Sequence, residues 1–170
     1  AALLRFAYMH YMRTAYPAKY SAYVLESAAQ YDFEPALVFA LIHTESRFNP
    51  SAVSKAQAMG LMQVTAETFE WAQFRSPEQE SLPANELFKP DINIKYGVYI
   101  MSLLREEFSD TRTMLAAYNA GMGNVRRWLQ NPEYSDDGIT LKYIPYPETR
   151  NYVEKVPDAK RLYDKLYDFT

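Results

Sequence analysis

One carboxyl group lies on the apolar face of a helix that is otherwise hydrophobic. Leu37, Leu41 and Glu45 follow one another at intervals of four residues, so a helix carries their side chains on one face. The segment 36–42 is apolar on every side, which is typical of a buried helix. Burial disfavours the charged form of a carboxyl group, and so does the negative end of the helix dipole in the last turn. Glu45 is therefore suited to keep a proton near neutral pH and to act as a general acid.

The position of Glu45 has a second interpretation that requires no chemistry. A Glu in the last turn of a helix can reach solvent where the helix frays, or it can pair with Arg47. The helical pattern alone favours neither interpretation. Glu67, Glu70 and Asp91 fit helix-start charges or surface residues, so no motif supplies a second catalytic carboxylate.

Motifs for several other kinds of chemistry are missing from the sequence. It contains no HExxH zinc motif, no glycine-rich phosphate-binding loop and no GxSxG nucleophile elbow. The segment His43-Thr44-Glu45 imitates the H-x-E of zinc deaminases, but those sites need a PCxxC segment and this chain has no Cys. We therefore expect His43 to be a helix-surface or packing residue, and disulfide and thiolate chemistry are excluded.

The composition is that of a globular chain of 170 residues with a formal net charge of −3. This mild acidity, with no Lys/Arg cluster denser than Arg126-Arg127, argues against a nucleic-acid-binding protein. The chain has 15 Tyr, 9 Phe and 2 Trp, which fit either a packed core or a sugar-binding surface. No apolar run approaches the roughly 20 residues of a membrane-spanning helix. Because the sequence begins at Ala1 without a Met or a signal peptide, we expect a trimmed chain whose given residues hold no signal or anchor.

Helices separated by Pro, Gly and Asn must position these side chains, so the sequence predicts a mainly α-helical single domain. A proline begins the helix of Glu45, and Asn49-Pro50 ends it. Loops are expected at 51–65 and 76–89, and short strands around 139–144. The other helices are expected at residues 2–14, 21–31, 66–74, 91–108, 111–121, 125–130, 149–155 and 158–167, with Pro157 between the last two.

Four motifs along the chain resemble those of one enzyme family. In chain order they are ESRFNPSAVS at 45–54, GLMQ at 60–63, AYNAG at 117–121 and ETRNY at 148–152. The set resembles the lytic transglycosylase domain of the Slt type, which belongs with the goose-type lysozymes. The resemblance extends over residues 23–163 and implies a mainly α, lysozyme-like fold, with one catalytic domain over residues 1–170.

The resemblance implies a role for each matching position. Glu45 matches the single catalytic acid and base of the family. Ser54 matches a serine that hydrogen-bonds near the reacting sugar, and Gln63 matches a glutamine that contacts the glycan. Tyr118 matches the tyrosine that faces and orients the catalytic carboxyl group, and Asn119 is its neighbour in the motif.

The last motif matches residues that support the site from behind. Glu148 and Arg150 match a buried acid–base pair, and Tyr152 is expected to pack beside it. Each position also has a purely structural interpretation: Asn119 as a helix cap, and Glu148 with Arg150 as an ordinary ion pair. The chain departs from the family after the GLMQ glutamine, where residues 64–66 read VTA in place of the frequent Met or Pro.

The resemblance implies a reaction that needs one carboxyl group and no metal or cofactor. Protonated Glu45 would donate to the glycosidic oxygen between N-acetylmuramic acid and N-acetylglucosamine, with help from the substrate's acetamido group. The resulting carboxylate would accept the proton of the muramyl 6-hydroxyl, which closes a 1,6-anhydro ring. The expected partner is a peptidoglycan glycan strand in the cell wall or periplasm. A goose-type lysozyme that adds water and a non-catalytic peptidoglycan-binding domain are the alternatives.

Overall fold

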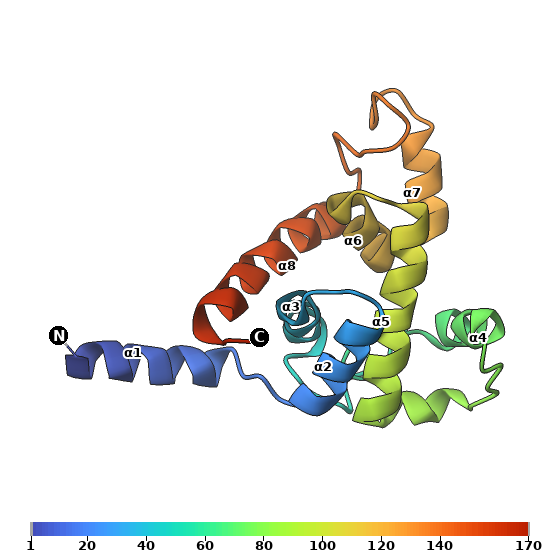
Figure 1. Ribbon diagram of the computed structural model, residues 1–170. Helices are drawn as coiled ribbons and strands as arrows, with labels where there is room; N and C mark the ends of the chain where they lie inside the picture. Colours follow the sequence, from blue (N-terminus) through green and yellow to red (C-terminus); the bar gives the residue numbers. More distant parts are fainter. Residues whose placement is uncertain (1, 170) are drawn as a thin grey trace. The chain divides into compact units, whose positions relative to one another are not determined.

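The computed structural model describes residues 2–169, which divide into two compact units joined by two long helices (Figure 1). The first unit holds the chain up to residue 98 and again from 157, and the second unit holds residues 99–156. The first contains α1 (Ala2–Ala15), α2 (Ser21–Gln30), α3 (Pro35–Ser46), α4 (Ala66–Arg75) and the 3₁₀ helix η1 (Ala84–Phe88), and the second contains α6 (Thr111–Ala120) and α7 (Met122–Leu129). Helices α5 (Pro90–Glu107) and α8 (Pro147–Leu166) each begin in one unit and end in the other.

The structure confirms a mainly α-helical chain, with most helix ends close to the predicted ones. Two of the starts have side-chain caps. The Thr65 hydroxyl accepts a hydrogen bond from the Thr68 N–H (3.2 Å), and the Asp110 carboxylate accepts one from the Thr113 N–H (2.8 Å). None of the described helices is long and apolar enough to cross a membrane.

Helix α3 is buried along most of its length, as its apolar sequence predicts. Pro35 is its first residue, and every side chain from 36 to 43 is buried. The helix ends at Ser46, ahead of the predicted stop at Asn49-Pro50, because Arg47 and Phe48 adopt left-handed backbone conformations with φ of 54° and 62°. The early end leaves the last turn of α3 at the edge of the core.

Helix α8 continues through Pro157, so the predicted break between two final helices is wrong. A proline inside a helix removes one backbone hydrogen bond, which normally weakens the helix. Here buried side chains recur at helical spacing on both sides of the proline: Tyr152, Val153, Val156, Ala159 and Tyr163. The burial of this continuous face outweighs the lost hydrogen bond.

The prediction of short strands at 139–144 is also wrong: these residues form bends and irregular backbone. The Asp137 carboxylate accepts hydrogen bonds from the N–H groups of Ile139 (2.8 Å) and Thr140 (2.7 Å). These bonds from Thr140 and Ile139 hold the pKa of Asp137 well below its usual range. The backbone thus bonds to a local side chain, where a strand would need a partner strand.

Aromatic side chains from three segments pack together in the core of the first unit. The Phe39 ring stacks on the Tyr163 ring with the centroids 5.5 Å apart and on the Phe169 ring at 5.0 Å. Tyr16, in the linker between α1 and α2, stacks on the His43 ring at 4.4 Å. These contacts join α3 to the linker and to the C-terminal segment, so the aromatic residues involved serve the core.

His43 is buried in this cluster, which confirms a packing role and predicts a pH-dependent stability. Burial lowers the pKa of His43 and the charge of Arg47 lowers it further, against a hydrogen bond with the Ala15 carbonyl. The unfolded chain then binds a proton that the folded chain does not, so the free energy of unfolding is expected to fall as the pH drops below about 6.5.

Thermal unfolding followed between about pH 8 and pH 5 measures this slope. The variant His43→Gln is expected to reduce the slope, whereas His10→Gln, at an exposed position, is the matched control and is expected to keep it. An unchanged slope in the His43 variant would contradict the assignment.

Candidate functional site

Glu45 lies in the last turn of α3, and its side chain is half-buried. The neighbouring Ser46 hydroxyl lies 2.7 Å from the carbonyl oxygen of Leu61, to which it donates, and this bond ties the turn to the following loop. Arg47, the alternative ion-pair partner of Glu45, directs Nη1 to Nε2 of His43 at 2.9 Å. The helix end is therefore tied to the loop that follows it, with the carboxyl group at the boundary between core and surface.

Ser54 begins a tight turn in the loop between α3 and α4. Its N–H donates to the Ala58 carbonyl (2.9 Å), and its hydroxyl oxygen accepts from the Ala58 N–H (3.1 Å). The acceptor role uses a lone pair of the half-buried Ser54 side chain, so the hydroxyl hydrogen can still donate to a ligand. This geometry suits the predicted hydrogen bond from Ser54 to a sugar.

Gln63 is half-buried at the other end of this loop, with its backbone in the left-handed region (φ 51°). Its side-chain Nε2 donates to the carbonyl oxygens of Ala52 (3.2 Å) and Gly60 (2.9 Å). Both hydrogens of the amide group are thus directed at the loop's own backbone. A ligand hydroxyl or N–H can therefore be met by the carbonyl oxygen of Gln63.

The side chain of Asn93 in α5 holds this loop through hydrogen bonds. Its side chain is fully buried, and Oδ1 accepts a hydrogen bond from the Met62 N–H at 2.7 Å. Its Nδ2 donates to the carbonyl oxygens of Met59 (3.0 Å) and Leu87 (2.8 Å). One amide group thereby satisfies three backbone groups, two of them buried, and holds the turn that presents Gln63.

Gly60 is required by this arrangement, which leads to a stability prediction. Its φ is 76°, and a Cβ atom there would collide with the Asn93 amide and the Leu87 carbonyl oxygen. We expect Gly60→Ala to lower the free energy of unfolding by about 3 kcal/mol. Gly138→Ala is the matched control, because Gly138 has a similar φ of 71° but its nearest neighbour, the Leu129 carbonyl oxygen, is 3.9 Å from the added Cβ.

Chemical denaturation of both variants measures the difference. The control is expected to lose only about 1 kcal/mol. Equal losses in the two variants would mean that backbone strain alone, and not the contact with Asn93, requires a glycine at position 60.

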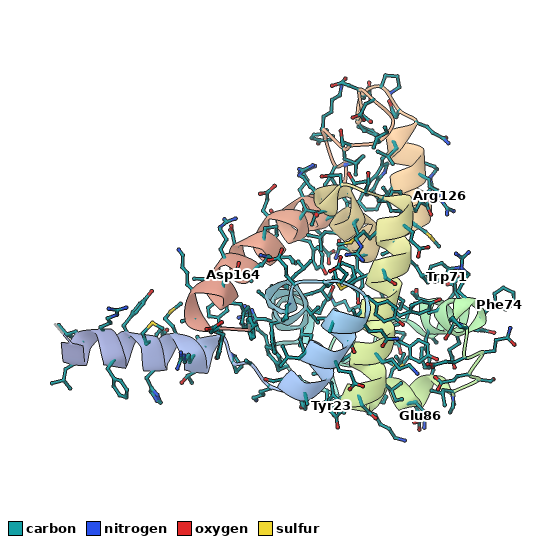
Figure 2. The ribbon with its side chains drawn as sticks, in the orientation of Figure 1. Tyr23, Trp71, Phe74, Glu86, Arg126 and Asp164 are labelled. Atoms are coloured by element: carbon teal, nitrogen blue, oxygen red, sulfur yellow. The ribbon has the colours of Figure 1, made fainter. Side chains whose placement is uncertain are left out.

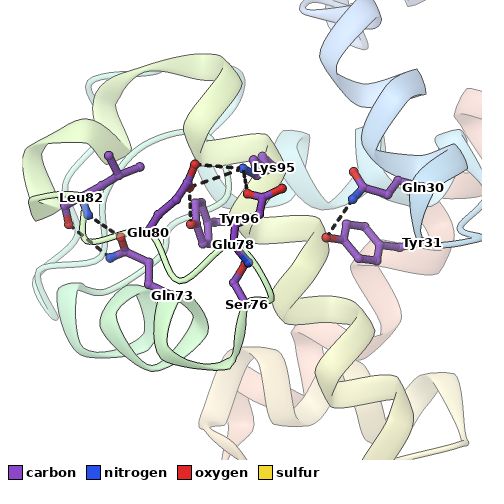
Figure 3. A network of polar contacts seen from close by, with 9 residues as sticks. All are labelled: Gln30, Tyr31, Gln73, Ser76, Glu78, Glu80, Leu82, Lys95 and Tyr96. Atoms are coloured by element: carbon purple, nitrogen blue, oxygen red, sulfur yellow. Dashed lines mark hydrogen bonds and ion pairs between the residues drawn. The ribbon is translucent and has the colours of Figure 1, made fainter.

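The polar segment expected as a surface loop at 76–89 contains η1 and is bonded to its neighbours (Figure 3). The buried Gln73 side chain accepts from the Leu82 N–H (2.5 Å), and Lys95 of α5 pairs with Glu78 and Glu80. Tyr96 donates to Glu80 (2.5 Å), and this bond, with the charge of Lys95, lowers the pKa of the Glu80 carboxyl group. The segment is therefore fixed to α4 and α5 over residues 78–82.

Tyr118 and Asn119 lie half-buried in the last turn of α6, in the second unit. The Asn119 Oδ1 atom accepts a hydrogen bond of 2.7 Å from the hydroxyl of Thr149, a buried residue near the start of α8. Asn124, and not Asn119, bonds the end of the helix, because its Nδ2 donates to the Ala120 carbonyl (2.7 Å). Asn119 thus links α6 to α8, and Thr149 is a partner that the sequence did not indicate.

The expectation of a buried pair between Glu148 and Arg150 is wrong. Glu148 is exposed in the first turn of α8, where its negative charge interacts favourably with the positive end of the helix dipole. The Arg150 guanidinium donates to the carbonyl oxygens of Ile144 (2.6 Å) and Pro145 (3.1 Å). Residues two apart on a helix do not face each other, which explains the absence of the pair. Tyr152 is buried, as a packing residue should be.

The structure thus places the expected residues in two groups. Glu45, Ser54 and Gln63 belong to the first unit, where the loop between α3 and α4 carries the last two, whereas Tyr118 and Asn119 belong to the second. Asn93 also belongs to this site, and its place between two isoleucines is the signal in the sequence of a buried polar group. Among the described residues, no three His, Cys, Asp or Glu side chains are grouped so that they could hold a metal ion.

The helices and the half-buried carboxyl group at the end of α3 define a lysozyme-like, mainly α-helical domain. The fold is similar to that of the 70 kDa soluble lytic transglycosylase from Escherichia coli, with a TM-score of 0.77 and 27% identity. The match covers 91% of this chain and 25% of the Escherichia coli chain. An inactive mutant of the lytic transglycosylase Slt from Pseudomonas aeruginosa matches 89% of this chain and 25% of its own, with a TM-score of 0.74 and 30% identity.

Residues 22–139 match the transglycosylase SLT domain, and the chain belongs to this family. Membrane-bound lytic murein transglycosylase C from Histophilus somni and its counterpart from Yersinia pestis are each 33% identical to it. In both cases the match covers 85% of this chain and 46% of the relative. The chain thus spans less than half the length of these relatives.

Proposed function

We propose that residues 1–170 form the catalytic domain of a peptidoglycan lytic transglycosylase. The substrate bond is the β-1,4 bond from N-acetylmuramic acid to N-acetylglucosamine, and no water is added. One observation carries the proposal: a member of the transglycosylase SLT family has a half-buried Glu45 at the end of a buried helix. The relatives named above are lytic transglycosylases.

Glu45 performs both proton transfers of the proposed reaction. In its protonated form it donates to the glycosidic oxygen while the bond from that oxygen to the anomeric carbon breaks. The acetamido oxygen of the muramyl residue stabilises the anomeric carbon in place of a second carboxylate. The Glu45 carboxylate then accepts the proton of the 6-hydroxyl, whose oxygen bonds to the anomeric carbon and closes the 1,6-anhydro ring. Glu45 ends protonated and ready for the next cycle.

The other residues bind and position the glycan. The Ser54 hydroxyl can donate to a sugar, and the Gln63 carbonyl oxygen can accept from a sugar hydroxyl or N-acetyl N–H, as their bonded geometry supports. Tyr118 and Asn119 are proposed to contact the substrate from the end of α6. At the start of α8, Glu148, Arg150 and Tyr152 support the second unit, and Arg150 does so through its bonds to the preceding backbone.

The proposed setting is extracytoplasmic, in the cell wall or periplasm, because peptidoglycan strands are found there. The relatives from Histophilus somni and Yersinia pestis are described as membrane-bound murein enzymes, which supports this setting. The proposed partner is the glycan strand, and the reaction requires neither nucleic acid nor cofactor.

The products that the protein releases from purified cell wall distinguish the possible reactions. Digestion with the wild-type protein is expected to release muropeptides with 1,6-anhydro ends, which mass spectrometry detects as lighter than reducing ends by one water. Reducing ends alone would show a hydrolase of the lysozyme type. Bound but uncleaved strands would show a binding domain, and either result would overturn the proposal.

A further inference from the structure

Helix α1 (blue in Figure 1) exposes large apolar side chains over residues 3–11. In α1, Leu4 is 78% exposed and Tyr11 is 68% exposed. The exposed large apolar residues of this helix are Leu3, Leu4, Phe6, Tyr8 and Tyr11. A helix that is apolar on most sides is normally covered, and 14 residues make a helix that is marginal in water by itself.

The exposed apolar residues of α1 include a continuous stripe. Leu4, Tyr8 and Tyr11 follow helical spacing and share one face. Met9 and Met12 are the half-buried residues of α1, and Met12 lies one turn after Tyr8. The protein therefore covers α1 only partly, at Met9 and Met12, and leaves the side chains of the stripe exposed.

The C-terminal end of α1 is fixed to the first unit, so the stripe has a set direction. The Arg13 guanidinium donates to the Leu166 carbonyl from Nε (3.1 Å) and Nη2 (2.9 Å) and lies over the Tyr167 ring. The Tyr167 hydroxyl donates to the Tyr16 carbonyl at 2.8 Å. These bonds anchor the last turn of α1, whereas its earlier turns present the apolar side chains.

The charge of this end of the chain is opposite to that of the rest. Residues 1–25 contain three basic residues (Arg5, Arg13 and Lys19) and no acidic one, and the first acidic residue is Glu26. The whole chain nevertheless has a net charge of −3, because all of its acidic residues lie from Glu26 onward. A positive, apolar and Tyr-rich helix is complementary to a negatively charged lipid surface.

We propose that α1 binds an anionic lipid bilayer, with Leu4, Tyr8 and Tyr11 in the headgroup and upper acyl region. Aromatic side chains with a polar tip favour this interface. The exposed Arg5 of the same helix reaches the lipid phosphates. A second copy of the chain is a poorer occupant of the stripe, because two such helices would bring like charges together. This surface lies outside the residues proposed to act on the glycan, so it adds an attachment site to the proposed function.

Co-sedimentation with vesicles tests the proposal on the whole chain. The wild type is expected to bind vesicles that contain phosphatidylglycerol and to bind phosphatidylcholine vesicles weakly, with binding to the former reduced by salt. The double variant Leu4→Ser/Tyr8→Ser is expected to bind at least about tenfold more weakly, because it removes two apolar groups from the interface. Phe74→Ser is the matched control, since Phe74 is 83% exposed and points outward from α4 (Figure 2).

Further measurements separate the possible outcomes. The double variant is expected to cleave cell wall as the wild type does, so failure of lipid binding and failure of catalysis are distinguishable. No binding to either vesicle, or equal loss in the Phe74 variant, would overturn the proposal. Sedimentation velocity that showed a wild-type dimer and a monomeric double variant would assign the stripe to self-association and would also overturn it.

Discussion

Replacement of Glu45 by Gln is expected to lower the rate of glycan-strand cleavage by at least about 1,000-fold, because one carboxyl group performs both proton transfers. Gln has nearly the shape of Glu but neither donates an acidic proton nor accepts one at this step. Its side chain fits the half-buried position at the end of α3, so the fold should be retained. The release of anhydro-muropeptides from purified cell wall measures the loss.

The design of this experiment separates loss of chemistry from loss of structure or binding. Glu70→Gln is the matched control, because Glu70 is an exposed carboxyl group on α4 and the same chemical substitution is made there. The control is expected to keep activity within about twofold, since surface substitutions rarely disturb a protein. The Glu45 variant should still bind cell wall and unfold at the wild-type temperature. Cleavage by this variant at a tenth of the wild-type rate or more would place the catalytic carboxyl elsewhere.

Replacement of Asn93 by Leu is expected to lower the free energy of unfolding by about 4 kcal/mol, because it leaves three backbone groups, two of them buried, without their partner. The Met62 N–H and the carbonyl oxygens of Met59 and Leu87 all bond to this one amide. Leu fills a similar volume, so the loss measures hydrogen bonding and not a cavity. Urea denaturation followed by circular dichroism gives the value.

An exposed asparagine provides the control for this substitution. Asn151→Leu, on the solvent side of α8, is expected to change stability by no more than about 0.5 kcal/mol. The Asn93 variant should also cleave glycan more slowly, because the turn that presents Gln63 loses its support. A loss below about 1 kcal/mol would show that water or a rearranged turn replaces the amide.

The sequence predicted the helices well because their signals are local. The all-apolar run of α3, Pro35 at its start and the side-chain caps at Thr65 and Asp110 each act within a few residues. Helical spacing also placed the Glu45 side chain on the face of Leu41 but favoured neither burial nor exposure, and the structure shows that the side chain is half-buried. The motifs from 45 to 121 identified the family for the same reason, since they lie within short stretches of sequence.

The errors arose where a local signal competed with distant packing. Pro157 is a helix breaker by itself, yet the buried face of α8 continues across it. Glu148 and Arg150 are close in sequence, but the helix that contains both turns their side chains apart. In each case the sequence carried the propensity, and the burial or helical phase of the neighbours decided the result.

The sequence by itself determined that the chain is helical, that it belongs with the SLT transglycosylases, and that Glu45 is the candidate acid and base. Only the tertiary structure decided how Gln63 is presented, because the bonds of Ser46 to Leu61 and of Asn93 to Met62 join residues 15 and 31 positions apart. It also decided that α1 leaves its apolar stripe uncovered. Hydrogen bonds and burial between distant segments depend on the fold of the whole chain, and local spacing does not encode them.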